Sequence, residues 1–165
     1  MMKRYLIILI IVIAAILLGV FFWIKHNIAS KASVSVLTEP ISLEEARKKL
    51  DIPLPDRASN ILYAGYAEWV AYDFILKFEA PVDICKSHAL LLLEEHNKQT
   101  SQEKLPLEFR TITETPTISG KLPFDIDWFD IHNIKNGLLA GDSGSHQPMI
   151  WIDTDRNIFY YRYTD

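Results

Sequence analysis

The chain has 165 residues and a single cysteine, so an internal disulfide is excluded and the fold must depend on a hydrophobic core. Residues 33–165 contain all 21 Asp and Glu but only 13 of the 17 Lys and Arg, which gives this part a formal net charge of −8. Such a charge, without any cluster of Lys and Arg, argues against nucleic acid as a partner.

The amino-terminal part contains an uncharged run of 20 residues from Tyr5 to Ile24. A helix of this length is about 30 Å long and matches the hydrocarbon core of a bilayer. The run is apolar all round, unlike an amphipathic core helix, so residues 1–24 are predicted to be a membrane anchor. Ser30-Lys31-Ala32 offers a cleavage site, but the run is longer than a signal-peptide core, which favours a retained anchor.

A polar tether is predicted over residues 25–40, followed by one domain over residues 41–165. A chain length of about 130 residues is enough for a single domain with its own core. A single amino-terminal span most often exports the domain that follows it, although Lys and Arg flank this span on both sides. We therefore expect a single-pass membrane protein with its domain in the periplasm or on the cell surface.

The domain is expected to open with a short helix. Ser42 and Glu45 have the spacing of a capping box, in which each side chain satisfies a free backbone amide at the start of a helix. This helix should run for two to three turns and stop before Pro53, because proline lacks the amide donor.

Two β-like runs follow, NILYAGYA at 60–67 and AYDFILKFEA at 71–80. They are predicted to pair as a hairpin around Glu68-Trp69. In the second run, apolar residues at positions 72, 74, 76 and 78 alternate with Asp73, Ile75, Lys77 and Glu79, which is the period of a strand with one buried face.

The longest helix is predicted from Pro81 to about Lys98, because Val82, Cys85, Ala89 and Leu92 recur at helical spacing. Two weaker elements follow it. LEFRTIT at 107–113 is a candidate strand, and DWFDIHNIKNG at 127–137 is a candidate helical turn ended by Gly137.

The end of the chain has the clearest β pattern. PMIWID at 148–153 and NIFYYRY at 157–163 flank Thr154-Asp155-Arg156 and predict a terminal hairpin. The expected order is helix, two strands, helix, strand, short turn and three strands. It indicates an α+β domain in which an antiparallel sheet packs on the 81–98 helix.

GDSGSH at 141–146 matches the residues around the nucleophile of chymotrypsin-like proteases, which would make Ser143 a nucleophile. Such a protease needs two β-barrels, and about 130 residues cannot build them. A Gly/Ser/Asp loop between strands is therefore favoured. A smaller pair of Ser143 or Ser145 with His146 stays open as an alternative, since adjacency does not establish its geometry.

Two acidic patterns resemble cation sites. Residues 153–157 resemble the first half of an EF-hand loop, but Ile158 and Thr164 stand where that loop needs Gly and Glu, so a hairpin turn is expected. Asp125, Asp127 and Asp130 surround Trp128 and Phe129. This alternation fits an edge segment with rings inward and carboxylates outward.

His88 and His96 lie about 12 Å apart along the predicted helix and cannot share a metal ion by themselves. Cys85 is expected to be a small buried apolar residue. No catalytic residue, cofactor or metal ligand is therefore assigned.

Aromatic residues are numerous in the predicted strands. Half of them should face the core, and the other half must face solvent, a covering loop or a partner. This surplus is the best indication of a binding surface in the sequence. The residues are Tyr63, Tyr66, Trp69, Tyr72, Phe74, Phe78, Trp151, Phe159, Tyr160, Tyr161 and Tyr163.

Segments 52–85, 128–139 and 150–165 together resemble small uncharacterised bacterial membrane-anchored proteins and lipoproteins. In these, a proline-flanked entry to a strand and an FxAP step from strand to helix recur, here Phe78-Glu79-Ala80-Pro81. The resemblance implies a location, supports the fold and transfers no catalytic residue.

The expected function is non-enzymatic binding of another protein or of a cell-envelope component. An immunity or inhibitor protein against an envelope toxin and a small hydrolase that uses the 142–146 loop are the alternatives.

Overall fold

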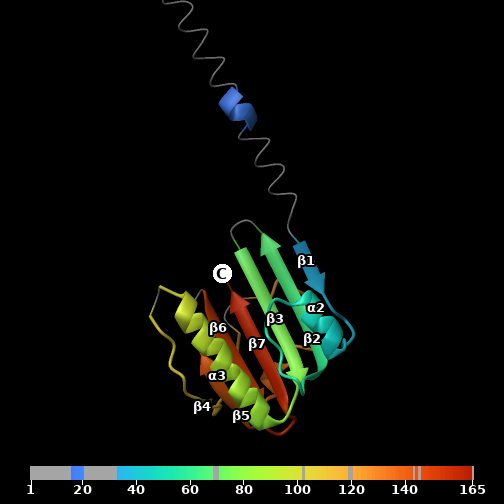
Figure 1. Ribbon diagram of the computed structural model, residues 1–165, viewed down its shortest axis with the longest axis vertical. Helices are drawn as coiled ribbons and strands as arrows, with labels where there is room; N and C mark the ends of the chain where they lie inside the picture. Colours follow the sequence, from blue (N-terminus) through green and yellow to red (C-terminus); the bar gives the residue numbers. More distant parts are fainter. Residues whose placement is uncertain are drawn as a thin grey trace, which may run out of the picture.

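The computed structural model describes residues 16–20, 33–68, 71–101, 103–118, 121–142, 144 and 146–164. It confirms an α+β domain built from helices and an antiparallel sheet (Figure 1). The elements are β1 (Ser33–Val36), α2 (Leu43–Lys49), β2 (Ser59–Glu68), β3 (Ala71–Glu79), α3 (Val82–Gln99), β4 (Arg110–Thr111), the 3-10 helix η1 (Ile131–Asn133), β5 (Gly137–Gly141), β6 (Gln147–Asp153) and β7 (Ile158–Thr164).

Within the described part of the chain, seven strands form one sheet in the order β1-β2-β3-β7-β6-β5-β4, and every neighbouring pair is antiparallel. The two predicted hairpins, β2–β3 and β6–β7, are confirmed. They join at the centre of the sheet, where β3 pairs with β7 from Asp73↔Thr164 to Glu79↔Ile158.

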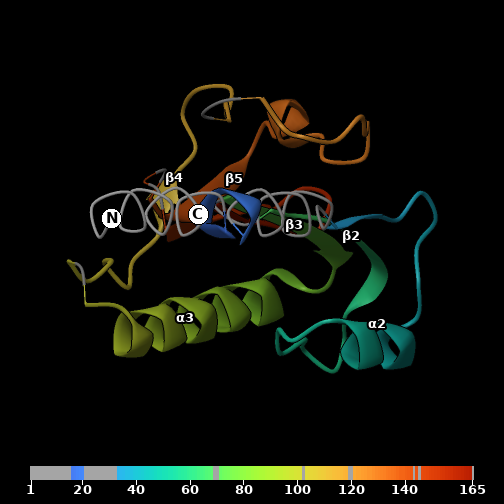
Figure 2. The same cartoon turned by 90° about the horizontal axis from the view of Figure 1, so that it is seen from above.

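The sheet is the middle of three layers (Figure 2). Helices α2 and α3 lie on one face. The opposite face is covered by residues 112–136, which contain η1 and are otherwise irregular in their described part. We call these residues the covering segment.

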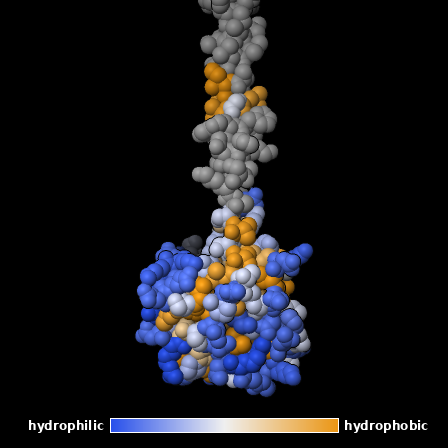
Figure 3. Space-filling model, turned by 90° about the vertical axis from the view of Figure 1, so that its right-hand side faces the viewer, coloured by the Kyte–Doolittle hydropathy of each residue, from blue (hydrophilic) through white to orange (hydrophobic). Residues whose placement is uncertain are grey.

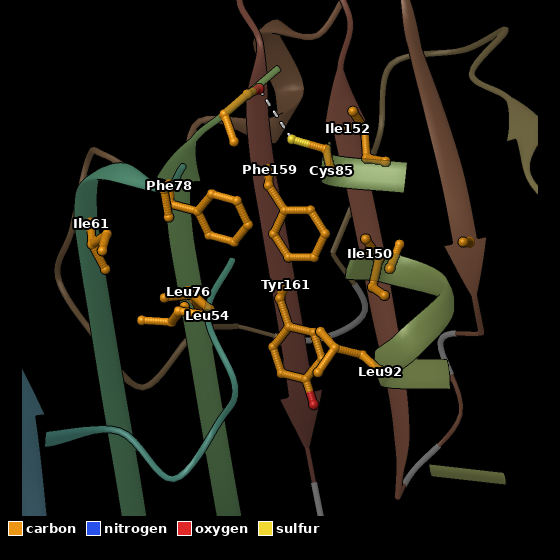
Figure 4. Packing of buried hydrophobic residues seen from close by; sticks show 14 of the residues in the cluster. Leu54, Ile61, Leu76, Phe78, Cys85, Leu92, Ile150, Ile152, Phe159 and Tyr161 are labelled. Carbon is orange, nitrogen blue, oxygen red and sulfur yellow. Dashed lines mark hydrogen bonds between the residues drawn. The ribbon is translucent and has the colours of Figure 1, made fainter. Parts of the chain in front are cut away.

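Each face of the sheet has its own core. Under the helices, the rings of Phe78 and Phe159 stack with centroids 4.5 Å apart, and Cys85 of α3 packs beside them (Figure 4). Under the covering segment, Phe129 meets Trp151 and Tyr160 edge to face.

The prediction that β3 has one buried face is therefore wrong. Phe74, Leu76 and Phe78 are buried under the helices, and Asp73 and Ile75 are buried on the other face. The reason is the covering segment, whose Phe124, Phe129, Ile131 and Ile134 close a second core.

Both predicted helices are confirmed. The Ser42 side chain accepts a hydrogen bond from the Glu45 amide at 3.2 Å, and α2 ends at Lys49, before Pro53. Helix α3 begins directly after Pro81 and buries Cys85, Ala89 and Leu92, as their spacing predicted.

The predicted tether needs a correction, because its residues Ser33–Val36 form strand β1 of the sheet. Their alternation of serine and β-branched valine suits an edge strand. The candidate strand at 107–113 shortens to β4, which lies at the other edge of the sheet with both residues exposed.

Gly137 begins β5 and does not end a helix. A Cβ atom there would lie 2.6 Å from an Ile134 methyl group and 2.7 Å from the carbonyl oxygen of Ile152. Close packing at the start of the strand therefore requires glycine at this position.

The predicted anchor lies, apart from residues 16–20, outside the described residues. Residues 16–20 are helical, and their apolar side chains are exposed. Among the residues that the structure describes, no helix combines the length and the apolar character that crossing a bilayer requires.

Candidate functional site

A network of charged side chains fixes the covering segment to the sheet. Lys77 of β3 and the hydroxyl of Tyr160 of β7 donate to one carboxylate oxygen of Asp130, at 3.1 and 2.6 Å. Arg156 donates to the other oxygen at 2.6 Å and also to Asp153 at 2.6 Å. Lys77 donates in addition to the carbonyl oxygen of Trp128 at 3.0 Å.

The contacts of Asp130 control its protonation. Burial by itself raises the pKa of this carboxyl group. The hydrogen bonds from Tyr160, Arg156 and Lys77 outweigh burial and hold the pKa well below its usual range. Burial and the bond to Asp130 raise the pKa of the Tyr160 hydroxyl. A permanently ionised carboxylate beside a permanently protonated phenol is suited to holding two elements together and not to proton transfer.

A second buried ion pair lies on the same face of the sheet. Arg162 of β7 donates from Nε and Nη2 to the two carboxylate oxygens of Asp73 of β3, at 3.1 and 2.7 Å. Both side chains are about nine-tenths buried. This bidentate pair also connects the two central strands, so it supports the sheet.

The acidic residues singled out in the sequence separate in the structure. Asp125 and Asp127 are exposed, whereas Asp130 turns inward, so the expectation that all three carboxylates face outward is wrong for Asp130. Asp153 accepts hydrogen bonds from the amides of Asp155 and Arg156, which confirms the hairpin turn. Among the described residues, no three His, Cys, Asp or Glu side chains form a group that could hold a metal ion.

The GDSGSH stretch connects β5 and β6, as the loop interpretation predicted. Ser143 and Ser145 lie outside the described residues. The amide of His146 donates to the Thr164 carbonyl oxygen at 2.7 Å, and the imidazole is exposed. The hydrolase alternative therefore stays an untested hypothesis.

Two of the candidate residues of α3, Cys85 and His88, are buried, whereas His96 is half-buried. Cys85 is buried, and its thiol donates to the Ala80 carbonyl oxygen at 3.3 Å, which confirms its structural role. His88 is buried against the stacked rings of Phe78 and Phe159, with ring centroids 5.6 and 5.3 Å away. Burial lowers the pKa of His88 to about 4, so this imidazole is neutral at pH 7.

A groove of about 320 Å³ lies on the helix-covered face, at the end of the sheet that bears β1. Its walls come from three strands and from the residues that follow α2. We call it the aromatic groove. Its lining residues are Ser33, Ser35, Lys49, Leu50, Asp51, Ile52, Tyr63, Gly65, Tyr66, Ala67, Tyr72 and Phe74.

Three stacked aromatic side chains supply apolar surface in the groove. The rings of Tyr72 and Phe74 lie nearly parallel at 8°, with centroids 6.4 Å apart, and the Tyr63 ring also stacks with Phe74 at 6.3 Å. Tyr72 keeps 38% of its surface exposed. Burial and the nearby Tyr163 raise the pKa of the Tyr72 hydroxyl, so this group is a neutral hydrogen-bonding partner at pH 7.

Gly65 contributes to the groove because it has no side chain. A Cβ atom at this position would only touch the Phe74 ring, at 3.6 Å. The groove combines apolar ring surface with serine hydroxyls and one charge of each sign, on Lys49 and Asp51. This combination suits an uncharged ligand with an apolar part, such as a peptide side chain.

Most of the aromatic surplus has a simpler explanation. Phe78, Phe159 and Tyr161 fill the core under the helices, and Trp151 and Tyr160 fill the core under the covering segment. Trp69 lies outside the described residues, and within these the part that remains at the surface centres on Tyr72 and the aromatic groove. Ser33, Ser35 and Gly65 could not be predicted as lining residues, because small residues carry no recognisable pattern in the sequence.

A second hollow, of about 310 Å³, lies between β4 to β6 and the start of the covering segment. Threonines and Trp151 line it, but the Trp151 ring is buried and presents no open face. The aromatic groove is therefore the better candidate site.

No protein-family model, no curated protein and no solved structure matches this chain.

Proposed function

We propose that this protein is a membrane-anchored, extracytoplasmic binding domain of a bacterium, which recognises another envelope protein or a cell-envelope component and catalyses no reaction. The observation that carries the proposal is the aromatic groove, with its partly exposed Tyr72 and the serine hydroxyls of its β1 wall. The apolar run from Tyr5 to Ile24 supports the anchor, as do the exposed apolar side chains of residues 16–20.

The anchor is tested by fractionation of cells that express the full chain. The protein should stay with the membranes in high salt and alkaline carbonate, and it should dissolve only in detergent. Protease added outside the inner membrane should degrade the domain. Recovery in the soluble fraction without detergent would contradict the anchor.

Binding is tested by cross-linking in intact envelopes with a matched pair of variants. Gly65→Leu fills the aromatic groove, whereas Gly65→Ala adds one methyl group in ordinary contact with Phe74. A partner should be captured by the wild type and by Gly65→Ala, with at least tenfold less captured by Gly65→Leu. Equal capture by all three would contradict a role for the groove.

The identity of the captured partner tests the two alternatives. A toxin among the captured proteins would assign the immunity function. Covalent labelling of Ser143 or Ser145 by a fluorophosphonate probe would favour the hydrolase.

A further inference from the structure

Among the residues that the structure describes, the outer edge of β1 carries backbone groups that no other strand uses. Strand β1 is the first in the sheet order, and its neighbour within the described residues is β2. The Leu37 amide donates to the Tyr63 carbonyl oxygen at 3.1 Å and continues the β1–β2 register. Hydrogen bonding alternates along an antiparallel pair, so the N–H and C=O groups of Val34 and Val36 point away from β2.

The side chains of this edge do not protect it. Edge strands in natural proteins usually carry lysine, proline or a bulge that prevents another chain from pairing. Residues 33–36 are Ser-Val-Ser-Val and contain neither charge nor proline. Val34 and Val36 are 60% and 36% exposed, and an apolar surface lies where β1 enters the domain (Figure 3).

The edge and the aromatic groove are continuous. Val34 and Val36 pair with Tyr66 and Ala64, on the face of the covering segment, so Ser33 and Ser35 project to the opposite face. There the two serines line the groove next to Tyr72 and Phe74. Because Ser35 of β1 and its partner Gly65 of β2 are both small, a large side chain that arrives beside β1 can extend over them towards the Phe74 ring of β3.

We propose that β1 accepts an extended, uncharged peptide segment of a partner protein as an additional strand, and that one large apolar or aromatic side chain of this segment occupies the aromatic groove. The backbone groups of Val34 and Val36 supply the hydrogen bonds, and the groove supplies specificity, which is how sheet-edge peptide recognition works in general. The inference rests on the proposed binding function and deepens it by naming the chemistry of the partner.

A second copy of the chain fits this edge less well. An antiparallel β1–β1 pair would direct the two amino-terminal segments towards opposite ends of the sheet. Two chains anchored in one membrane through residues 1–24 cannot pair in this way. The Lys49 ammonium group is already bound to Glu45 at 2.7 Å, so it is not available to an acidic segment, and the aromatic rings of the groove suit an apolar side chain.

The experiment selects peptides from a phage-displayed library of random heptapeptides on the full chain in phospholipid nanodiscs, after subtraction on empty nanodiscs. Enriched peptides should be uncharged, with apolar or aromatic residues at alternate positions. Fluorescence anisotropy then measures the affinity of one enriched peptide for the variants. Hydrogen exchange should show protection of the Val34 and Val36 amides when the peptide is bound.

Two variants of one residue give the control. Val34→Pro removes an outward N–H group that β2 does not use, so affinity should fall at least tenfold. Val34→Thr keeps both the N–H group and the branched shape, so affinity should stay within about twofold. Thermal unfolding checks that both variants are folded, and the protection of the wild-type amides is an independent readout.

Failure to enrich peptides over empty nanodiscs would overturn the inference. So would equal affinity of Val34→Pro and wild type, or a dimer in sedimentation that Val34→Pro dissociates. If Gly65→Leu abolishes partner capture from envelopes while Val34→Pro has no effect on it, strand addition is wrong and the proposed binding function still stands.

Discussion

At the scale of single residues, Asp130 links the covering segment to the sheet. Its carboxylate receives hydrogen bonds from Lys77 and Tyr160, which belong to the two central strands, and from Arg156 in the terminal hairpin. Removing one partner of such a network leaves the others with uncompensated charge. Asp130 should therefore contribute far more to stability than the neighbouring acidic residues.

We expect Asp130→Asn to lower the free energy of unfolding by about 3 kcal/mol, because Lys77 and Arg156 then share no carboxylate with the segment that covers them. Asp127→Asn is the matched control, since Asp127 is exposed in the same segment, and its effect should stay within about 0.5 kcal/mol. Urea denaturation at pH 7 measures both values. Equal effects of the two substitutions would show that the network is not stabilising.

His88 makes stability depend on pH. Its pKa is lowered by burial to about 4 in the folded chain, against 6.5 for an unperturbed histidine. The unfolded chain therefore binds the proton more readily, and stability is complete above pH 6.5 and declines as the pH falls towards 4. The expected loss between pH 8 and pH 4.5 is about 2.5 kcal/mol.

Urea denaturation at a series of pH values measures this loss. The apolar variant His88→Met should lose most of the pH dependence in this window. Burial also lowers the pKa of His96, which leaves a smaller residual slope of the same sign. The depressed pKa of Asp130 acts only at lower pH, so it does not contribute in this window. A slope in His88→Met equal to that of the wild type would exclude His88 as its origin.

Cys85 should be chemically inert in the folded protein. Burial, and to a lesser degree the charge of Asp83, raise the pKa of the thiol to about 12, so almost no reactive thiolate is present at pH 8. A thiol reagent such as DTNB should react only after denaturant is added. Ser87→Cys, two positions further along α3 on its exposed side, should react at once. Rapid labelling of Cys85 without denaturant would contradict its burial.

The sequence allowed the role of Cys85 to be predicted, because a lone cysteine at helical spacing with apolar residues is usually buried. It did not allow the role of Asp130 to be predicted. Asp125, Asp127 and Asp130 look alike in the sequence, and the partner that turns Asp130 inward, Lys77, is 53 residues away. Such a pairing depends on the tertiary fold.

At the scale of elements, the covering segment differs from the rest of the domain. Its described part contains η1 and otherwise irregular backbone, and side chains hold it on the sheet. A segment attached in this way should open at a lower free energy than the strands beneath it.

We expect amides of residues 121–134 to exchange hydrogen faster than those of β3 and β7. Lys77→Met, which removes the bonds to Trp128 and Asp130, should accelerate this exchange further and leave β7 protected. Lys121→Met replaces an exposed lysine of the same segment and should change nothing. Hydrogen exchange detected by mass spectrometry measures all three. Equal acceleration in the covering segment and β7 would instead indicate global destabilisation.

Local signals predicted the helices and hairpins well. Each of these signals depends on residues only a few positions apart: the capping box of α2, Pro81 before α3 and the alternation in β3. They failed for β1, because four residues of serine and valine next to a polar stretch look like a linker until β2 pairs with them. They also failed for Gly137, where glycine serves close packing with Ile134 and Ile152 and not a helix end.

At the scale of the whole molecule, pairing of β3 with β7 joins residues that are 79 to 91 positions apart and creates a single sheet with two cores. The composition and the order of elements predicted the α+β class. The strand order and the second core could not be predicted, because nothing in the sequence of β3 distinguishes a face covered by a loop from a face open to water.

The last described residue, Thr164, ends β7 at the same end of the sheet where β1 begins (Figure 1). For a chain held by an amino-terminal anchor, a fluorescent protein or epitope attached behind Thr164 would therefore sit at the end of the domain that faces the anchor. The exposed Asp56-Arg57 turn before β2 lies at the far end of the sheet and is the better place for a short epitope. Labelling strategies for this protein should start from that turn.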